Sequence, residues 1–222
     1  MYKITSIAIS LALIFSLFGC TAIQNANKTQ KGAVVGAGGG ALIGGLIGGS
    51  TGVLIGAVVG GAAGGIIGNQ MDKQAKAIEE AVPGAEVKRV GEGIQVVFDD
   101  RSGVNFALNS EDLTDAAKSN LNAIAEIFVE FPDSDLFIEG YTDDTGDEKY
   151  NLQLSEKRAR TVESYLKSQG VANARFESVR GLGEANPRFP NDSKENQAKN
   201  RRVEIGIAAN EKAIQDAKAQ AK

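Results

Sequence analysis

The chain has 222 residues, with 24 lysines and arginines against 28 aspartates and glutamates, which gives a formal net charge of −4. This mild acidity argues against a protein that binds nucleic acid mainly through phosphate contacts. The sequence has no histidine and a single cysteine. A histidine-dependent triad, a His-ligated zinc site and an intramolecular disulfide are therefore excluded, and we expect no cofactor and no metal.

Residues 1–19 have the organisation of a secretory signal peptide. Lys3 gives a positive start, and an apolar run follows over residues 7–18. The run is shorter than the roughly 20 apolar residues that a bilayer-spanning helix needs. It ends at Leu17-Phe18-Gly19-Cys20, which resembles a bacterial lipoprotein box. The resemblance implies cleavage before Cys20 and lipidation of its thiol. An ordinary signal sequence with an incidental cysteine is the alternative.

After a polar spacer at 20–31, the uncharged segment 32–71 contains glycine at every fourth position. The ten glycines in register are Gly32, Gly36, Gly40, Gly44, Gly48, Gly52, Gly56, Gly60, Gly64 and Gly68. In a helix this period forms one slowly drifting stripe, along which two backbones can approach closely, as in membrane helix pairs. We predict a hairpin of two short helices, about 32–48 and 53–68. A flexible glycine-rich linker is the alternative.

From residue 72 onward the composition is that of a soluble domain with a leading linker. The pattern of apolar residues and chain breakers predicts helices at 72–82, 110–131, 149–169 and 210–222, and strands at 93–98, 136–141, 174–180 and 202–207. Ser110 is the predicted N-cap of the second helix. Residues 103–108 form either a short strand or an extended loop, and 186–200 are predicted as a polar loop. The fold class is α+β in the order β-α-β-α-β-β, with two helices on one face of the sheet.

Three sequence blocks in this domain resemble the OmpA-like peptidoglycan-associating family. The blocks are Phe106–Ser110 with Leu113, then Glu139–Gly146 with Tyr150-Asn151 and Arg158-Ala159, then Gly181–Glu184 with Asn200–Ile205. They fall in family order within residues 93–208, which we assign to the domain, with linker 72–92 and tail 209–222. The uncharged segment likewise resembles the glycine zippers of outer-membrane lipoproteins. The resemblance implies an OmpA C-terminal-like fold that binds the diaminopimelate of the peptidoglycan stem peptide.

The resemblance places the ligand clamp on Asp143 and Arg158. The free end of diaminopimelate is a zwitterion, so a site for it needs one fixed anion and one planar, bidentate cation. Asn109, Thr142 and Asn151 match family positions that add hydrogen bonds to the ligand. Taken singly, Asp143 is equally typical of a loop-capping residue, Arg158 of a surface helix arginine and Asn151 of a helix cap.

Arg202 is a further candidate for the site. Arg201 and Arg202 would point to opposite faces of a strand, so at most one of them reaches the ligand. We retain Arg202 as the supporting residue.

The predicted function is an outer-membrane tether. The lipid on Cys20 and the zipper would lie in the outer membrane, while the periplasmic domain holds peptidoglycan non-covalently. The residue after the cysteine is Thr21 and not aspartate, and the resemblance to lipoproteins then implies export to the outer membrane. The expected partners are peptidoglycan and outer-membrane lipid, with no nucleic acid. The alternative is a zipper that forms a pore or a self-associating scaffold. An enzyme is not expected, because the mature domain has no histidine or cysteine and no recognisable carboxylate pair.

Overall fold

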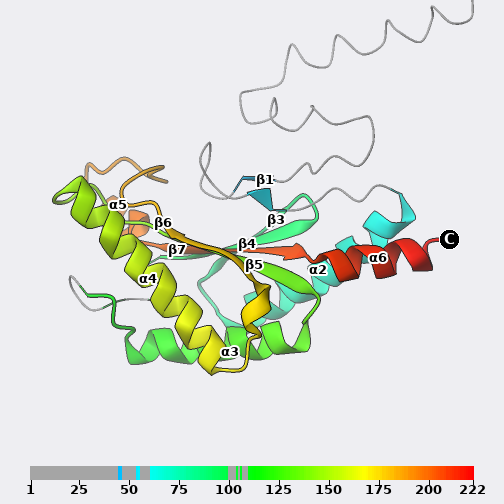
Figure 1. Cartoon of the computed structure of the whole chain (residues 1–222). Helices are drawn as coiled ribbons and strands as arrows, with labels where there is room; N and C mark the ends of the chain where they lie inside the picture. The colour runs from blue at the N-terminus through cyan, green and yellow to red at the C-terminus, as the bar shows by residue number, and fades with distance from the viewer. Residues whose placement is uncertain (1–44, 47–53, 56–60, 100–103, 105, 107–109) are drawn as a thin grey trace, which may run out of the picture.

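The centre of the protein is a five-stranded sheet of strand order β3-β4-β7-β5-β6 (Figure 1). The computed structural model describes residues 45–46, 54–55, 61–99, 104, 106 and 110–222. The strands are β3 (Glu86–Val90), β4 (Gly93–Phe98), β5 (Ser134–Gly140), β6 (Phe176–Gly181) and β7 (Val203–Ala209). Neighbouring strands are antiparallel except for the parallel pair β5 and β6.

One face of the sheet carries the apolar core, because side chains alternate between the two faces of a strand. In β7, Val203, Ile205 and Ile207 are buried in the core cluster, and Glu204 lies between them on the other face. The core face is covered by α2 (Ala62–Ala81), α3 (Asp115–Glu130) and α4 (Glu148–Ser168) (Figure 1). The predicted α+β class is confirmed, and three helices, not the two predicted, cover this face.

The sequence did not predict that β3, the first strand of the sheet, is the partner of β4. The sequence left open whether residues 103–108 pair with the strand at 93–98. In the structure β3 pairs with β4 in a tight antiparallel hairpin, with Val90 opposite Gly93. Within 103–108 the structure describes Val104 and Phe106, and Phe106 makes only an isolated bridge to Leu113.

The glycine-rich segment differs from the predicted helical hairpin where the structure describes it. Gly45–Leu46 (β1) pairs antiparallel with Leu54–Ile55 (β2), so these residues are short strands and not helix. Helix α2 instead begins at Ala62 and continues without a break through the predicted linker helix to Ala81. The apolar face of Ile67, Met71 and Ile78 packs into the core, which favours one continuous helix over two. Among the described helices, none is both long enough and apolar enough to span a membrane.

Helix α3 starts later than predicted. Its N-cap is Thr114, whose hydroxyl accepts a hydrogen bond from the N–H of Ala117, and not Ser110. The Ser110 hydroxyl accepts from the N–H of Asp112 and donates to its carboxylate, which forms a local turn. Such short polar side chains satisfy nearby backbone groups outside helices as readily as at a cap. At the far end of the domain, a 3₁₀ turn at Asn173–Arg175 delays the start of β6 to Phe176.

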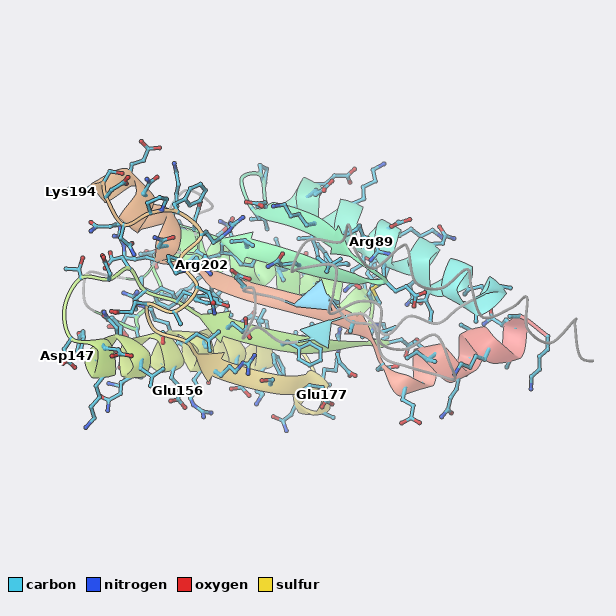
Figure 2. The ribbon with its side chains drawn as sticks, turned by 90° about the horizontal axis from the view of Figure 1, so that it is seen from above. Arg89, Asp147, Glu156, Glu177, Lys194 and Arg202 are labelled. Atoms are coloured by element: carbon cyan, nitrogen blue, oxygen red, sulfur yellow. The ribbon has the colours of Figure 1, made fainter. Side chains whose placement is uncertain are left out.

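Two further helices flank β7. The predicted loop at 186–200 ends in the short helix α5 (Lys194–Asn200), capped by the Ser193 hydroxyl. The sequence did not reveal this helix, because its residues are mostly polar and form no apolar stripe. Helix α6 (Glu211–Gln220) follows β7 and buries Ala213 and Ala217, and it packs against α2. Figure 2 shows Asp147 and Lys194 at one end of the sheet and α6 at the other.

Helix α4 approaches the ends of β5 and β6 at two glycines. A Cβ on Gly140 would overlap the carbonyl of Ser155, and a Cβ on Gly181 would overlap the backbone of Glu156. The Ser155 hydroxyl accepts a hydrogen bond of 2.8 Å from the N–H of Gly183 in the loop after β6. The absence of side chains at these glycines therefore sets how α4 lies against the ends of the two strands.

We expect Gly140→Ala to destabilise the domain by about 1–3 kcal/mol or more, because the new methyl group must displace the α4 backbone. The free energy of unfolding from chemical denaturation measures the effect. Gly65→Ala on the exposed side of α2 is the matched control, since its Cβ would meet open space. There alanine should be neutral or stabilise by up to about 1 kcal/mol. Equal effects of the two substitutions would contradict the close approach.

Candidate functional site

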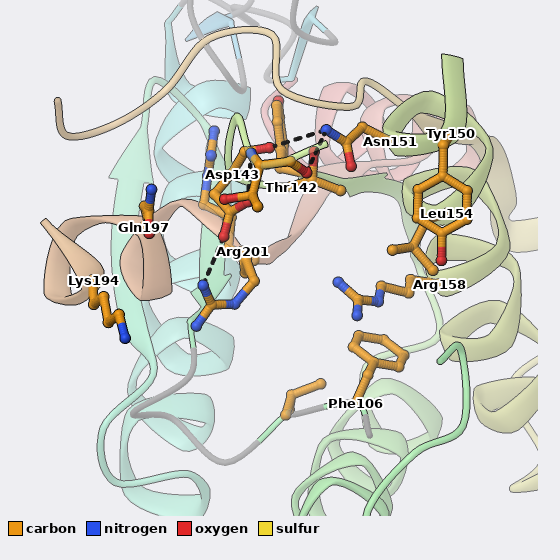
Figure 3. A pocket seen from close by; sticks show the side chains of 14 residues that line it. Phe106, Thr142, Asp143, Tyr150, Asn151, Leu154, Arg158, Lys194, Gln197 and Arg201 are labelled. Carbon is orange, nitrogen blue, oxygen red and sulfur yellow. Dashed lines mark hydrogen bonds and ion pairs between the residues drawn. The ribbon is translucent and has the colours of Figure 1, made fainter. Parts of the chain in front are cut away.

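A cavity of about 500 Å³ opens where the C-terminal end of β5 meets the N-terminal ends of α4 and β7. Its lining residues are Val104, Phe106, Tyr141, Thr142, Asp143, Thr145, Tyr150, Asn151, Leu154, Arg158, Lys194, Gln197, Arg201 and Arg202. The cavity thus contains the two predicted clamp residues and two of the predicted hydrogen-bonding residues. In Figure 3, Arg158 and Phe106 lie on one side of the cavity, and Asp143 and Arg201 lie on the other.

Asp143 lies in the loop that follows β5, and it is 7% exposed. One carboxylate oxygen accepts a hydrogen bond from the N–H of Thr145 at 2.9 Å, and the other forms an ion pair with Nη1 of Arg201 at 2.7 Å. Burial alone would raise the pKa of Asp143, but the hydrogen bonds from Arg201 and Thr145 outweigh it and hold the pKa below its usual value. The carboxylate is therefore a fixed anion at neutral pH.

Arg158 lies on α4 and is also 7% exposed. Its Nε donates to the carbonyl of Ser110 at 3.1 Å, and its guanidinium lies 4.9 Å from the centre of the Phe106 ring. The carbonyl and the ring hold the guanidinium in place by a hydrogen bond and a cation–π contact. The predicted pair of opposite charges therefore lines one cavity, with each charge fixed by its own set of contacts.

Thr142 has a buried hydroxyl in this cavity. Its Oγ1 has no hydrogen-bond partner among the described residues, although the Thr142 N–H donates to the carbonyl of Gly183 at 2.8 Å. A buried hydroxyl without a partner costs free energy, so such a group is typically satisfied by water or by a ligand. Its position beside Asp143 suits it to a polar group of a bound molecule.

Asn151 braces the loop that carries Asp143. Its side-chain amide donates to the carbonyls of Asp143 and Thr145 and to the carboxylate of Glu184, at 3.4, 3.2 and 3.0 Å. The N-cap of α4 is Asp147, so the capping role considered for Asn151 belongs to another residue. The predicted site residue Asn109 and the predicted lipidation site Cys20 lie outside the described residues.

The choice between the two neighbouring arginines has to be revised. Arg201 follows α5 and pairs with Asp143. Arg202 touches the cavity, but its guanidinium forms a 2.6 Å ion pair with Glu204 and lies 3.6 Å from the centre of the Tyr141 ring, with its side chain only 1% exposed. The strand argument does not apply here, because β7 begins only at Val203, and both side chains line the cavity.

Sequence reasoning also missed the contribution of α5. Lys194 and Gln197 reach the cavity from this helix, which was predicted as loop. Phe106 was part of a recognised block but had no assigned role. Its place under Arg158 depends on a chain segment 52 positions away, and no local pattern indicates such a contact.

We expect Arg201→Gln to raise the pKa of Asp143 toward its ordinary value, measured by NMR titration of the side-chain carboxyl carbon. Because the pKa of Asp143 is lower in the folded than in the unfolded state, the ionised carboxylate stabilises the fold, and this stabilisation is fully present above the unfolded pKa of about 3.9. The stabilisation is lost as the pH falls through the folded-state pKa. The variant should therefore be less stable than wild type at pH 7, and the gap should close near pH 2. Lys157→Gln, which lies outside the cavity, should leave the Asp143 titration unchanged. An unchanged pKa in the Arg201 variant would contradict the ion pair.

Comparison with known proteins identifies two parts of the chain. Residues 105–201 match the OmpA family, and residues 1–72 match the YMGG-like Gly-zipper family. The chain is 35% identical to the probable lipoprotein YiaD of Escherichia coli K12 over 138 residues, which is 62% of this chain and 63% of that protein. It is 41% identical to the peptidoglycan-binding protein ArfA of Mycobacterium tuberculosis over 104 residues, which is 47% of this chain and 32% of that protein.

Among solved structures, the fold is similar to that of a putative MotB-like protein from Desulfovibrio vulgaris. The TM-score is 0.55 at 29% sequence identity, and the match covers 66% of this chain and 91% of that one. The chain spans less than two thirds of the length of either curated relative. It carries an OmpA-family domain at residues 105–201, preceded by a YMGG-like glycine-zipper segment at residues 1–72.

Proposed function

We propose that the OmpA-family domain binds peptidoglycan non-covalently, through the free amino-acid head group of diaminopimelate in the stem peptide. The observation that carries the proposal is that Asp143 and Arg158 line one cavity with fixed side chains. The name of one relative, a peptidoglycan-binding protein, supports the same class of ligand.

The chemistry of the cavity suits a zwitterion with an ammonium and a carboxylate on one carbon. The ligand ammonium would pair with the Asp143 carboxylate. The ligand carboxylate would pair with the Arg158 guanidinium, whose planar geometry favours two parallel hydrogen bonds. The Thr142 hydroxyl, which has no hydrogen-bond partner among the described residues, is suited to either pole. Phe106 and the Ser110 carbonyl fix Arg158 before the ligand arrives, which reduces the entropy lost on binding.

The proposal extends to a tether in the cell envelope. A lipidated Cys20 and the glycine zipper would hold the N-terminal part in the outer membrane, while the domain holds the wall from the periplasm. Single sites of modest affinity suffice, because many copies on one polymer act together. The proposed role is binding and not catalysis, so the wall should be released intact after incubation with the protein.

We expect Asp143→Asn and Arg158→Gln each to weaken binding to purified peptidoglycan by about 2 kcal/mol or more, roughly 30-fold, because each leaves one pole of the ligand unpaired. Co-sedimentation of the full-length chain in detergent measures the loss. Circular dichroism checks that the fold persists.

Matched controls lie next to each clamp residue. Asp144→Asn removes an exposed carboxylate from the same loop, and Lys157→Gln removes a charge from the same helix. Both should bind like wild type. Normal binding by the two clamp variants would disprove the site, and release of soluble stem peptides or glycan fragments would show that the protein is an enzyme.

We expect Cys20→Ser to block lipidation and to leave an unprocessed precursor that no longer fractionates with the outer membrane. Mass spectrometry of the mature N-terminus reports the modification, and membrane fractionation reports the location. A Thr21→Ser variant keeps the cysteine and should behave as wild type. If the Cys20 variant stays in the outer membrane, the zipper alone provides the anchor.

A further inference from the structure

One wall of the cavity is apolar. Tyr150, Leu154 and Arg158 follow one another at intervals of four residues on α4, so their side chains lie along one face of the helix. All three line the cavity, and Phe106 joins them from the segment before α3. In Figure 3 these four side chains lie on one side of the cavity, and Asp143 lies on the other. The Arg158 guanidinium therefore shares its wall with two aromatic rings and a leucine.

Tyr150 is the exposed member of this wall. It is 47% exposed, whereas Leu154 on the next turn is only 8% exposed. Among the described residues two other large apolar side chains are exposed, Val129 and Leu152, and neither lines the cavity. Single exposed apolar side chains are common on protein surfaces. An aromatic ring at the mouth of a cavity, continuous with buried apolar side chains, is instead typical of a contact with a bound molecule.

The polar side of the cavity independently indicates a bound molecule. The Thr142 side chain is 5% exposed, and its hydroxyl has no hydrogen-bond partner among the described residues. The carboxylate of Asp143 lies next to it in the chain, and both residues line the cavity. The cavity thus combines two opposite charges, a buried hydroxyl and an apolar wall. This combination suits an α-amino acid whose side chain is apolar.

The ligand of the proposed function has a matching apolar part. In diaminopimelate, three methylene groups join the free amino-acid head group to the half that is built into the stem peptide. When the head group is held between Asp143 and Arg158, a chain that leaves it on the Arg158 side meets the apolar wall. Complete removal of one methylene group from water strengthens binding by about fourfold. The wall can therefore contribute to affinity in addition to the charged clamp.

We propose that Phe106, Tyr150 and Leu154 bind the methylene chain of the ligand, so that the site also accepts free α-amino acids with unbranched apolar side chains. This inference rests on the proposed function and adds a ligand class to the same site. Such amino acids carry the same zwitterionic head group and the same kind of chain, without the peptide. They would compete with peptidoglycan for the cavity.

The test compares D-norleucine with D-alanine, which share the head group and differ by three methylene groups. The D configuration is that of the free end of meso-diaminopimelate in a stem peptide. Isothermal titration calorimetry with the full-length chain in detergent should show that wild type binds D-norleucine about eightfold more tightly, roughly twofold per methylene group, because the wall is partly open to water. D-norleucine should also release the chain from purified peptidoglycan at a correspondingly lower concentration than D-alanine.

Three variants test whether the preference comes from the wall. Tyr150→Ser should reduce it to about threefold or less, because the ring no longer covers the chain. Tyr150→Phe keeps the ring and should retain the wild-type preference. Leu152→Ala is the matched control, because Leu152 lies on the same turn of α4, is also 47% exposed and does not line the cavity. It should keep the wild-type preference, and circular dichroism checks that each variant is folded.

The outcomes separate this inference from the function on which it rests. If wild type binds meso-diaminopimelate but binds D-norleucine and D-alanine equally, the apolar-wall site is wrong while the clamp stands. If the preference survives in Tyr150→Ser, or falls equally in Leu152→Ala, contact with Tyr150 is not its source and the inference is wrong. If wild type binds neither meso-diaminopimelate nor D-norleucine, the proposed function and this inference fail together.

Discussion

The site depends on the close approach of α4 to the ends of β5 and β6. Gly140 and Gly181 leave room for the backbone of Ser155 and Glu156, and the Ser155 hydroxyl is bonded to the loop after β6. Because this contact is backbone to backbone, it fixes the helix relative to the strand with little freedom. Arg158 lies one turn beyond the contact on α4, so its distance from the loop after β5 is set by the fold.

The neighbouring residues Arg201 and Arg202 have different structural roles. Arg202 is buried against Glu204 and the Tyr141 ring at the cavity wall, where the ion pair must offset the free-energy cost of removing both charges from water. Additional bonds from Arg202 to the carbonyls of Asn200 and Asn186 help to do so, and they fix the chain on both sides of α5. Arg201 is thereby directed outward to Asp143. The pair of Arg202 and Glu204 supports the geometry, and the pair of Arg201 and Asp143 lines the cavity.

The sequence predicts the elements whose signals are local. The strand at 93–98 coincides with β4, because a turn glycine and alternating apolar residues mark it directly. The clamp residues came from a recognised family motif, and not from periodicity. The predictions that failed concern features that residue type and periodicity do not mark. Thr114 replaces Ser110 as the cap because the Ser110 hydroxyl is used in its own turn, and Arg201 rather than Arg202 faces Asp143 because the strand starts after both. Helix α5 has no apolar stripe, so periodicity could not reveal it.

The topology also separates the cavity from the part of the chain that follows the zipper. The cavity lies at the C-terminal end of β5 and the N-terminal end of β7, whereas α6 follows the other end of β7 and packs against α2. Seven residues of strand place these ends roughly 20 Å apart. In a tether of the proposed kind, a load between wall and membrane would run largely along β5 and β7. The hydrogen bonds between these two strands would then be sheared together and not opened one after another, so the central strand pair is the part of the fold suited to bear that load.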